Sequence, residues 1–148
     1  LLIAEHPSLE PMIRAYFENH LETLSPIAGT EAILAALLDA GYDVTALTNY
    51  SGETFAKAEA TYPVLARFRG ITVSGREGMV KPDRALYARH AERFGLDPAT
   101  TLFFDDSQKN VDGAHAAGWQ AELFTTPEQM RADLARHGVV LVAHPTPI

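Results

Sequence analysis

The apolar residues of this chain follow two different patterns, and the change between them predicts its architecture. Up to residue 40 they recur every three or four positions, which is the period of an amphipathic helix. One such helix is predicted over residues 8–24, with Ser8 as its N-cap. A second is predicted to end just before Gly41, and its apolar face carries Ile33, Leu34, Leu37 and Leu38. After Gly41 the pattern changes to short apolar runs separated by helical segments.

Short apolar runs predict four β-strands. They cover residues 44–48, 71–73 and 101–104, with a weaker run at 121–124. Each run is nearly continuous rather than alternating, which is typical of strands buried on both faces. Such strands belong to parallel sheets covered by helices, so the runs predict an α/β fold with an open parallel sheet.

Helical segments lie between and after these strands. One is bracketed by Pro82 and Gly95, and another begins after Ser107. A third opens with Thr126-Pro127-Glu128-Gln129, which is a capping box with proline at the first helical position. Residues 138–148 fit either an edge strand or a loose tail, and the sequence does not choose between them.

The composition fits one globular domain and excludes several functional classes. Of the 148 residues, 47% are hydrophobic and 21% are charged. The chain has no cysteine, which excludes a disulfide scaffold and thiolate chemistry and fits a cytoplasmic location. A net charge of -7 without a basic block argues against a nucleic-acid partner. No apolar run approaches the roughly 20 residues of a membrane span, so no membrane association is expected.

Polar residues gather where the predicted strands end. Strand 44–48 ends in Thr48-Asn49, strand 101–104 runs into Asp105-Asp106, and Lys81 precedes the helix that starts near Pro82. In open parallel sheets, binding sites form outside the carboxyl ends of the strands. We therefore expect these side chains to lie at one edge of the sheet.

The adjacent aspartates indicate a cation site. Two carboxylates about 4 Å apart repel each other by about 1 to 4 kcal/mol, and a bound cation removes that cost. Hard oxygen ligands without neighbouring histidine or cysteine suit Mg²⁺, which keeps several waters and often binds a phosphate. Because successive strand residues face opposite sides, one aspartate is expected to bind directly and the other to assist, in an order that the pattern leaves open. The alternative is that one aspartate caps the next helix while the other faces water.

The remaining polar residues fit an anionic ligand. The Thr48 hydroxyl and the backbone N–H groups beside Asn49 are suitable anchors for phosphoryl oxygens. The ammonium of Lys81 suits a phosphate or a carboxylate. Asn110 lies four residues beyond Asp106, where its amide would orient an aspartate, a water or the lysine. For each of them the alternative is an ordinary solvated residue.

The six histidines show no metal-ligand spacing. His20 and His90 are predicted to lie on helix surfaces, with a structural role.

Three segments, taken in order, resemble motifs II, III and IV of the haloacid dehalogenase-like (HAD) hydrolases. They are Leu47-Thr48-Asn49, Val80-Lys81-Pro82-Asp83, and Phe103-Phe104-Asp105-Asp106-Ser107 with Asn110 and Val111 beyond it. The resemblance covers roughly residues 26–136. It is closest to subfamily I, in the branch that contains α-D-glucose-1-phosphate phosphatases. It implies a Rossmann-like core with helices on both faces over residues 26–148. Residues 1–25 would be the C-terminal part of a helical cap and its return to the core.

The resemblance also implies an activity and roles for the polar residues. It implies a magnesium-dependent phosphatase that acts on a small phosphorylated metabolite, such as a sugar phosphate, through an aspartyl-phosphate intermediate. Thr48 and the backbone beside Asn49 would bind the transferring phosphoryl group, and Lys81 would neutralise its charge. Asp106 would bind Mg²⁺ directly with Asp105 assisting, and Asn110 would hold the cluster together.

The chain departs from the family pattern in one respect. Motif I is an Asp-x-Asp pair that supplies the nucleophile and the acid/base at the end of the first strand, and it does not occur in these 148 residues. In the family that strand lies between strands 44–48 and 101–104. The expectation is therefore a truncated or partly ordered chain that is inactive as it stands. The alternatives are a 2-haloacid dehalogenase on the same fold and a non-catalytic binding module.

Overall fold

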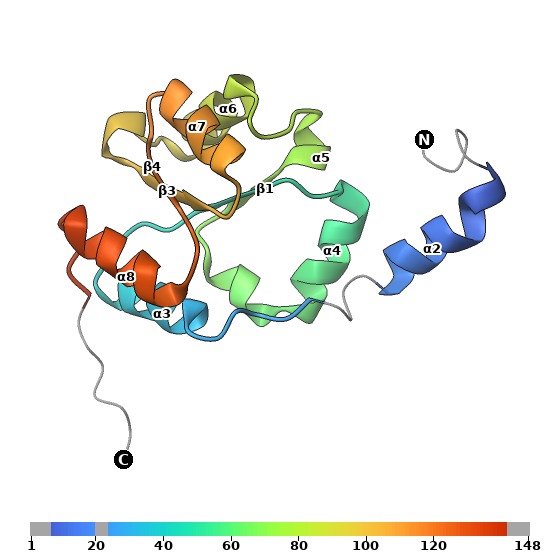
Figure 1. Cartoon of the computed structure of the whole chain (residues 1–148), viewed down its shortest axis with the longest axis horizontal. Coiled ribbons are helices and arrows are strands. Elements are labelled where there is room, and N and C mark those ends of the chain that lie inside the picture. The colour runs from blue at the N-terminus through green and yellow to red at the C-terminus, as the bar shows by residue number, and fades with distance from the viewer. Residues whose placement is uncertain (1–6, 20–23, 142–148) are drawn as a thin grey trace, which may run out of the picture.

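A computed structural model describes residues 7–19 and 24–141 (Figure 1). The strands are β1 (Ala46–Thr48), β2 (Ile71–Val73), β3 (Leu102–Asp105) and β4 (Gln120–Leu123). The α-helices are α2 (Glu10–Asn19), α3 (Thr30–Asp39), α4 (Gly52–Thr61), α5 (Ser74–Glu77), α6 (Arg84–Phe94), α7 (Gln108–Ala116) and α8 (Pro127–Arg136). Short 3₁₀ turns are η1 (Pro7–Leu9), η3 (Pro63–Arg67) and η4 (Pro98–Thr100). The alternation of strands and helices confirms the predicted α/β class.

All the strand pairing that the structure describes is parallel, and it forms two separate pairs. β1 pairs with β2, with Leu47 opposite Thr72. β3 pairs with β4, with Asp105 opposite Leu123. Within residues 7–19 and 24–141, no ladder joins β1 to β3. The sheet is therefore divided between the two strands whose ends carry the predicted site residues.

The helices cover both sides of the strands. α6 and α7 lie on one side, and α3 and α8 lie on the other (Figure 1). α7 packs on β3 and β4, and its inward residues Val111 and Ala114 are buried. The main core joins β1 to these helices and holds Leu47, Leu86, Tyr87, Ala91, Val111, Ala114, Trp119 and Ala121. A smaller cluster of Phe55, Ala58 and Val73 joins α4 to β2.

Local capping explains where the helices begin and end. Asp83, the residue after Pro82, accepts a hydrogen bond from the Ala85 N–H through its side chain and caps α6, which begins at Arg84, while Gly95 ends the helix with φ 62°. Thr126 caps α8 by accepting from the N–H of Gln129, as its sequence predicts. These caps fix the lengths of the helices that support the strands.

Two parts of the helix content differ from the sequence pattern. α4 was not predicted, because its few inward residues are small or polar, with Phe55 the one large apolar side chain among those that are buried. The helix predicted over residues 8–24 is described as η1 and α2, and residues 20–23 lie outside the described part. α2 lies apart from the strands (Figure 1).

Residues 138–141 form no strand, and residues 142–148 of the predicted tail lie outside the described part. None of the helices in the described ranges has the length and the apolar character needed to span a bilayer.

Candidate active site

A buried ion pair lies at the centre of the predicted site. Lys81 Nζ lies 2.5 Å from Asp105 Oδ2 and also donates to the Leu47 carbonyl at 3.0 Å. The two charged side chains are 8% and 5% exposed. The structure thus brings together the ends of β1 and β3 and the loop before α6, as the sequence predicts. Because both side chains are buried, water cannot take the place of either partner. Separating the pair would therefore leave an uncompensated charge in the protein interior.

Both carboxylate oxygens of Asp105 accept hydrogen bonds. Its Oδ1 accepts hydrogen bonds from the Ser107 N–H and from Asn110 Nδ2, each at 2.9 Å. Burial would raise the pKa of this carboxyl. The hydrogen bonds from Lys81, Asn110 and Ser107 outweigh burial and hold the pKa below its usual value. Asp105 is therefore ionised and oriented at neutral pH.

Asp106 occupies a different environment, although it is the next residue. It is exposed, and it lines the same pocket as Lys81 and Asp105. Two carboxylates, one fixed and one open, are the hard oxygen donors that suit Mg²⁺. In the described part of the chain no three His, Cys, Asp or Glu side chains come together at a metal-sized site. The pair therefore fits one side of a Mg²⁺ site, with the other positions left for water, phosphate and a further ligand.

Thr48 and Asn49 lie at the carboxyl end of β1. Thr48 is the last residue of the strand and is partly buried. The Asn49 side chain binds the main chain of Lys81 in two places: Nδ2 donates to the Lys81 carbonyl at 3.0 Å, and the Lys81 N–H donates to Oδ1 at 2.8 Å. The predicted residues Thr48, Asn49 and Lys81 therefore lie at the same edge of the sheet. The sequence did not indicate that the Asn49 amide would bind the main chain of Lys81.

Two further residues support the site from the core side. The Tyr87 hydroxyl donates to the Asn110 carbonyl at 2.7 Å, and burial together with the charge of Asp105 raises the pKa of Tyr87 to about 12. Gly113 lies against Pro82, where an added Cβ would come within 2.6 Å of the proline Cβ. Sequence reasoning missed both. A glycine inside the predicted helix at residue 113 was the one signal for a close approach.

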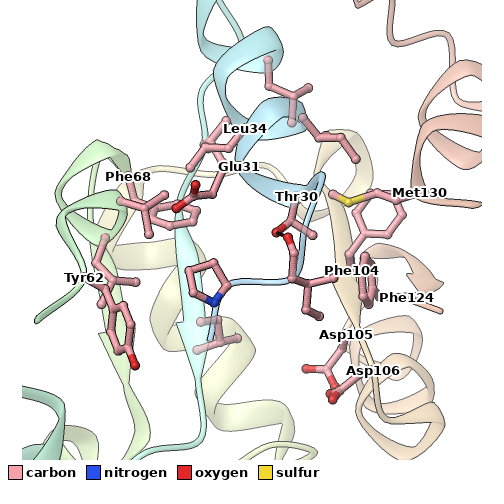
Figure 2. A pocket seen from close by; sticks show the side chains of 18 of the residues that line it. Thr30, Glu31, Leu34, Tyr62, Phe68, Phe104, Asp105, Asp106, Phe124 and Met130 are labelled. Carbon is pink, nitrogen blue, oxygen red and sulfur yellow. Dashed lines mark hydrogen bonds between the residues drawn. The ribbon is translucent and has the colours of Figure 1, made fainter. Parts of the chain in front are cut away.

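An open, mostly apolar pocket of about 830 Å³ adjoins the two carboxylates. Figure 2 shows Tyr62 and Phe68 on one side of it, Phe104 and Phe124 on the other, and the aspartates at one end. Leu47 of β1 also lines it. The pocket therefore lies between β1 and β3, with side chains from residues 24–37 as a further wall, and we name it the interstrand slot.

One histidine prediction was wrong. His90 does not lie on the surface of its helix: it is 2% exposed. Its two ring nitrogens lie 2.9 Å from Thr45 Oγ1 and 2.8 Å from Thr72 Oγ1. The predicted structural role fits this position, because the imidazole links α6 to the middle residue of β2 and to the residue before β1.

The chain resembles known proteins over most of its length. A family model described as haloacid dehalogenase-like hydrolase matches residues 3–123. A sesquiterpene phosphatase of Aspergillus oryzae, astK, is 32% identical over 106 residues, which are 72% of this chain and 54% of that protein. A Mycobacterium tuberculosis phosphatase, MT3486, is 33% identical over 106 residues, covering 68% of this chain and 49% of that protein. The chain thus spans about half the length of these relatives.

Solved structures share the fold. One is a HAD family enzyme of Bacteroides thetaiotaomicron, crystallised as a mutant in complex with magnesium and inorganic phosphate. Its TM-score is 0.57 at 24% identity, over 66% of this chain and 53% of that one. At this identity the likeness establishes the fold alone.

Proposed function

Since the chain belongs to the haloacid dehalogenase-like hydrolase family, we propose that the complete protein is a magnesium-dependent phosphatase of small phosphorylated metabolites. The observation that carries the proposal is the buried Lys81–Asp105 pair, with the exposed Asp106 beside it at the strand ends. Phosphoryl transfer depends on positioning and on fixed charges around the phosphate, and this cluster supplies both. The phosphatase names of two relatives point the same way.

The residues have separate tasks in this proposal. Lys81 presents its ammonium to the phosphate, and Thr48 with the backbone at Asn49 binds the phosphoryl oxygens. Asp106 would hold Mg²⁺ directly and Asp105 would assist, because Asp105 already accepts three hydrogen bonds. When bound, the metal supplies positive charge at the phosphate. Asn110 keeps Asp105 in place.

The nucleophile would come from a strand in the interstrand slot. The slot has apolar walls, it lies between the unjoined β1 and β3, and it opens beside the carboxylates. An Asp-x-Asp at the end of such a strand would lie next to Lys81. Its first carboxylate would attack phosphorus as the bond to the leaving oxygen breaks, and water would then hydrolyse the aspartyl phosphate. Residues 26–148 would form the core around this strand and residues 1–25 part of a cap.

The test measures phosphate release by the complete gene product. The panel holds sugar phosphates first, and a prenyl phosphate because one relative is named a sesquiterpene phosphatase. Turnover should require Mg²⁺ and stop with a chelator. Lys81→Ala and Asp106→Asn should each lower kcat by about 100-fold or more. The matched controls Lys109→Ala and Asp112→Asn, both exposed on α7, should stay near the wild-type rate.

Three results would contradict the proposal. Full activity in Lys81→Ala or Asp106→Asn would refute the assigned roles. Halide release from 2-haloacids that survives chelation would indicate a dehalogenase instead. A gene whose upstream codons hold no Asp-x-Asp after an apolar strand, with no turnover of any panel compound, would indicate a binding module.

A further inference from the structure

Asn49 is joined to Lys81 by a paired contact that is unusual for a side chain. One planar amide accepts from the Lys81 N–H at 2.8 Å and donates to the Lys81 carbonyl at 3.0 Å. This is the exchange of bonds that two opposed residues make in an antiparallel sheet. Two bonds to one residue define its orientation as well as its distance, so the amide holds the main chain of Lys81 in one position.

The tip of the same lysine returns to the same strand end. Lys81 Nζ donates to the carbonyl of Leu47, two residues before Asn49. Both ends of the lysine are therefore attached to residues 47–49, and the side chain spans between them. A lysine stem is flexible and has about 2 kcal/mol of rotamer entropy to lose, so its charge is placed well only where both ends are held.

The loop that carries Lys81 is held on two sides, and Asn49 provides the contact on the side of β1. On the other side of the loop, Pro82 lies against Gly113 of α7 without room for a methyl group. That contact limits movement toward the helix, while the Asn49 amide prevents movement away from β1. Asp105, which receives the ammonium, is fixed separately by Ser107 and Asn110.

We infer that Asn49 is a positioning residue that holds Lys81 in register with Asp105 and with the phosphoryl site. The inference rests on the proposed phosphatase function for its kinetic consequence, and on the contacts above for its structural one. It differs from a direct contact between the Asn49 side chain and substrate, because the amide oxygen and the amide nitrogen each bind the main chain of Lys81. Displacing a catalytic group by about 1 Å costs about 100-fold in rate.

The kinetic test compares Asn49→Ala and Asn49→Asp with Gln120→Ala in the complete gene product. Gln120 is the matched control, because its amide also donates to a distant backbone carbonyl, that of Ala99, but at the start of β4. Asn49→Ala should lower kcat by about 10- to 100-fold with KM within about threefold of wild type. Asn49→Asp keeps the acceptor for the Lys81 N–H, so its kcat should lie between that of Asn49→Ala and that of Gln120→Ala. A raised KM with unchanged kcat would overturn the inference, because it would indicate direct substrate binding.

A second test does not depend on turnover. The chain has three lysines, at positions 57, 81 and 109, of which Lys57 and Lys109 are exposed and serve as internal references. Brief acetylation followed by peptide mass spectrometry gives the labelling rate of Lys81 relative to Lys57. Asn49→Ala should raise this ratio several-fold, whereas Gln120→Ala should leave it unchanged.

The two tests separate the possible failures. A wild-type protein that releases no phosphate contradicts the proposed function, while the labelling ratio still decides whether Asn49 holds Lys81. An unchanged ratio in Asn49→Ala overturns the inference even if phosphatase activity is found. Circular dichroism establishes that each variant is folded. If Asn49→Ala is not, Asn49→Asp takes its place in both tests, with the same direction of change and a smaller size.

Discussion

The stability of this protein should fall between pH 6.5 and pH 4 because of one buried histidine. His90 is 2% exposed and is bound at both ring nitrogens by Thr45 and Thr72. Burial, and to a lesser extent the positive charges of Arg93 and Arg69, lower the pKa of His90 from 6.5 to about 4. Between these two pH values the unfolded chain therefore binds a proton at His90 that the folded protein does not bind.

The size and the direction of the effect follow from linkage. Between pH 6.5 and about 4 the unfolded chain binds more protons at this site, so the free energy of unfolding decreases as the pH falls. At about 1.4 kcal/mol per pKa unit, the loss is about 2 kcal/mol at pH 5 and about 3 kcal/mol below pH 4. Above pH 6.5 this contribution no longer changes. The carboxyls whose pKa is lowered, such as Asp105 and Glu77, contribute stability that is lost only at lower pH, below ordinary values of 3.8 and 4.5.

The assay is urea unfolding at pH 7 and pH 5, followed by circular dichroism and by the emission of Trp119. The indole ring of Trp119 lies 5.9 Å from the imidazole of His90, so its emission also reports the local environment. The His90→Gln variant should lose about 2 kcal/mol less than wild type between the two pH values. A matched control is His115→Gln, an exposed histidine on α7, which should keep the wild-type dependence. Equal losses in wild type and His90→Gln, or a His90 proton resonance that titrates near pH 6.5, would refute the reasoning.

Three further changes test the packing around the site by urea unfolding at pH 7. Asp105→Asn leaves the Lys81 ammonium buried without its partner and should cost about 3 to 5 kcal/mol, so a stability near wild type would show that the pair is solvated. Gly113→Ala places a methyl group 2.6 Å from Pro82 Cβ and should cost about 1 to 3 kcal/mol; no change would mean that the loop yields freely. Thr126→Ala removes the side-chain cap of α8 and should cost about 1 kcal/mol, whereas Thr126→Ser should restore most of it.

Much of the fold was predictable because local chemistry and packing agree along most of the chain. β2 covers residues 71–73 as predicted, and α6 lies between Pro82 and Gly95. β1 is shorter than the run at 44–48: Val44 accepts a bond from Arg69 N–H, but the ladder itself starts at Ala46. α4 was missed because its buried face includes the hydroxyl of Thr54 and the small Ala58, so little periodicity is visible.

The sequence predicts which residues form the site better than it predicts the contacts that they make with one another. The order of motifs and the parallel sheet bring Thr48, Lys81 and Asp105 to one edge. Asp105 and Asp106 are the same residue type in adjacent positions, and only the register of β3 decides that Asp105 is buried against Lys81. Likewise, a sequence does not show that the Asn49 amide meets a backbone 32 residues away. Such contacts depend on the packing of distant segments, which no local pattern encodes.

The interstrand slot has a practical consequence for protein engineering. If the nucleophile arrives on a strand that fills the slot, binding of that strand and completion of the catalytic centre are a single event. A synthetic peptide with the required Asp-x-Asp, supplied in trans, would then switch on phosphate release in proportion to its occupancy. Under the proposed function, this chain would serve as one half of a split-enzyme reporter, whose background would be low because neither half would hold a complete set of catalytic groups.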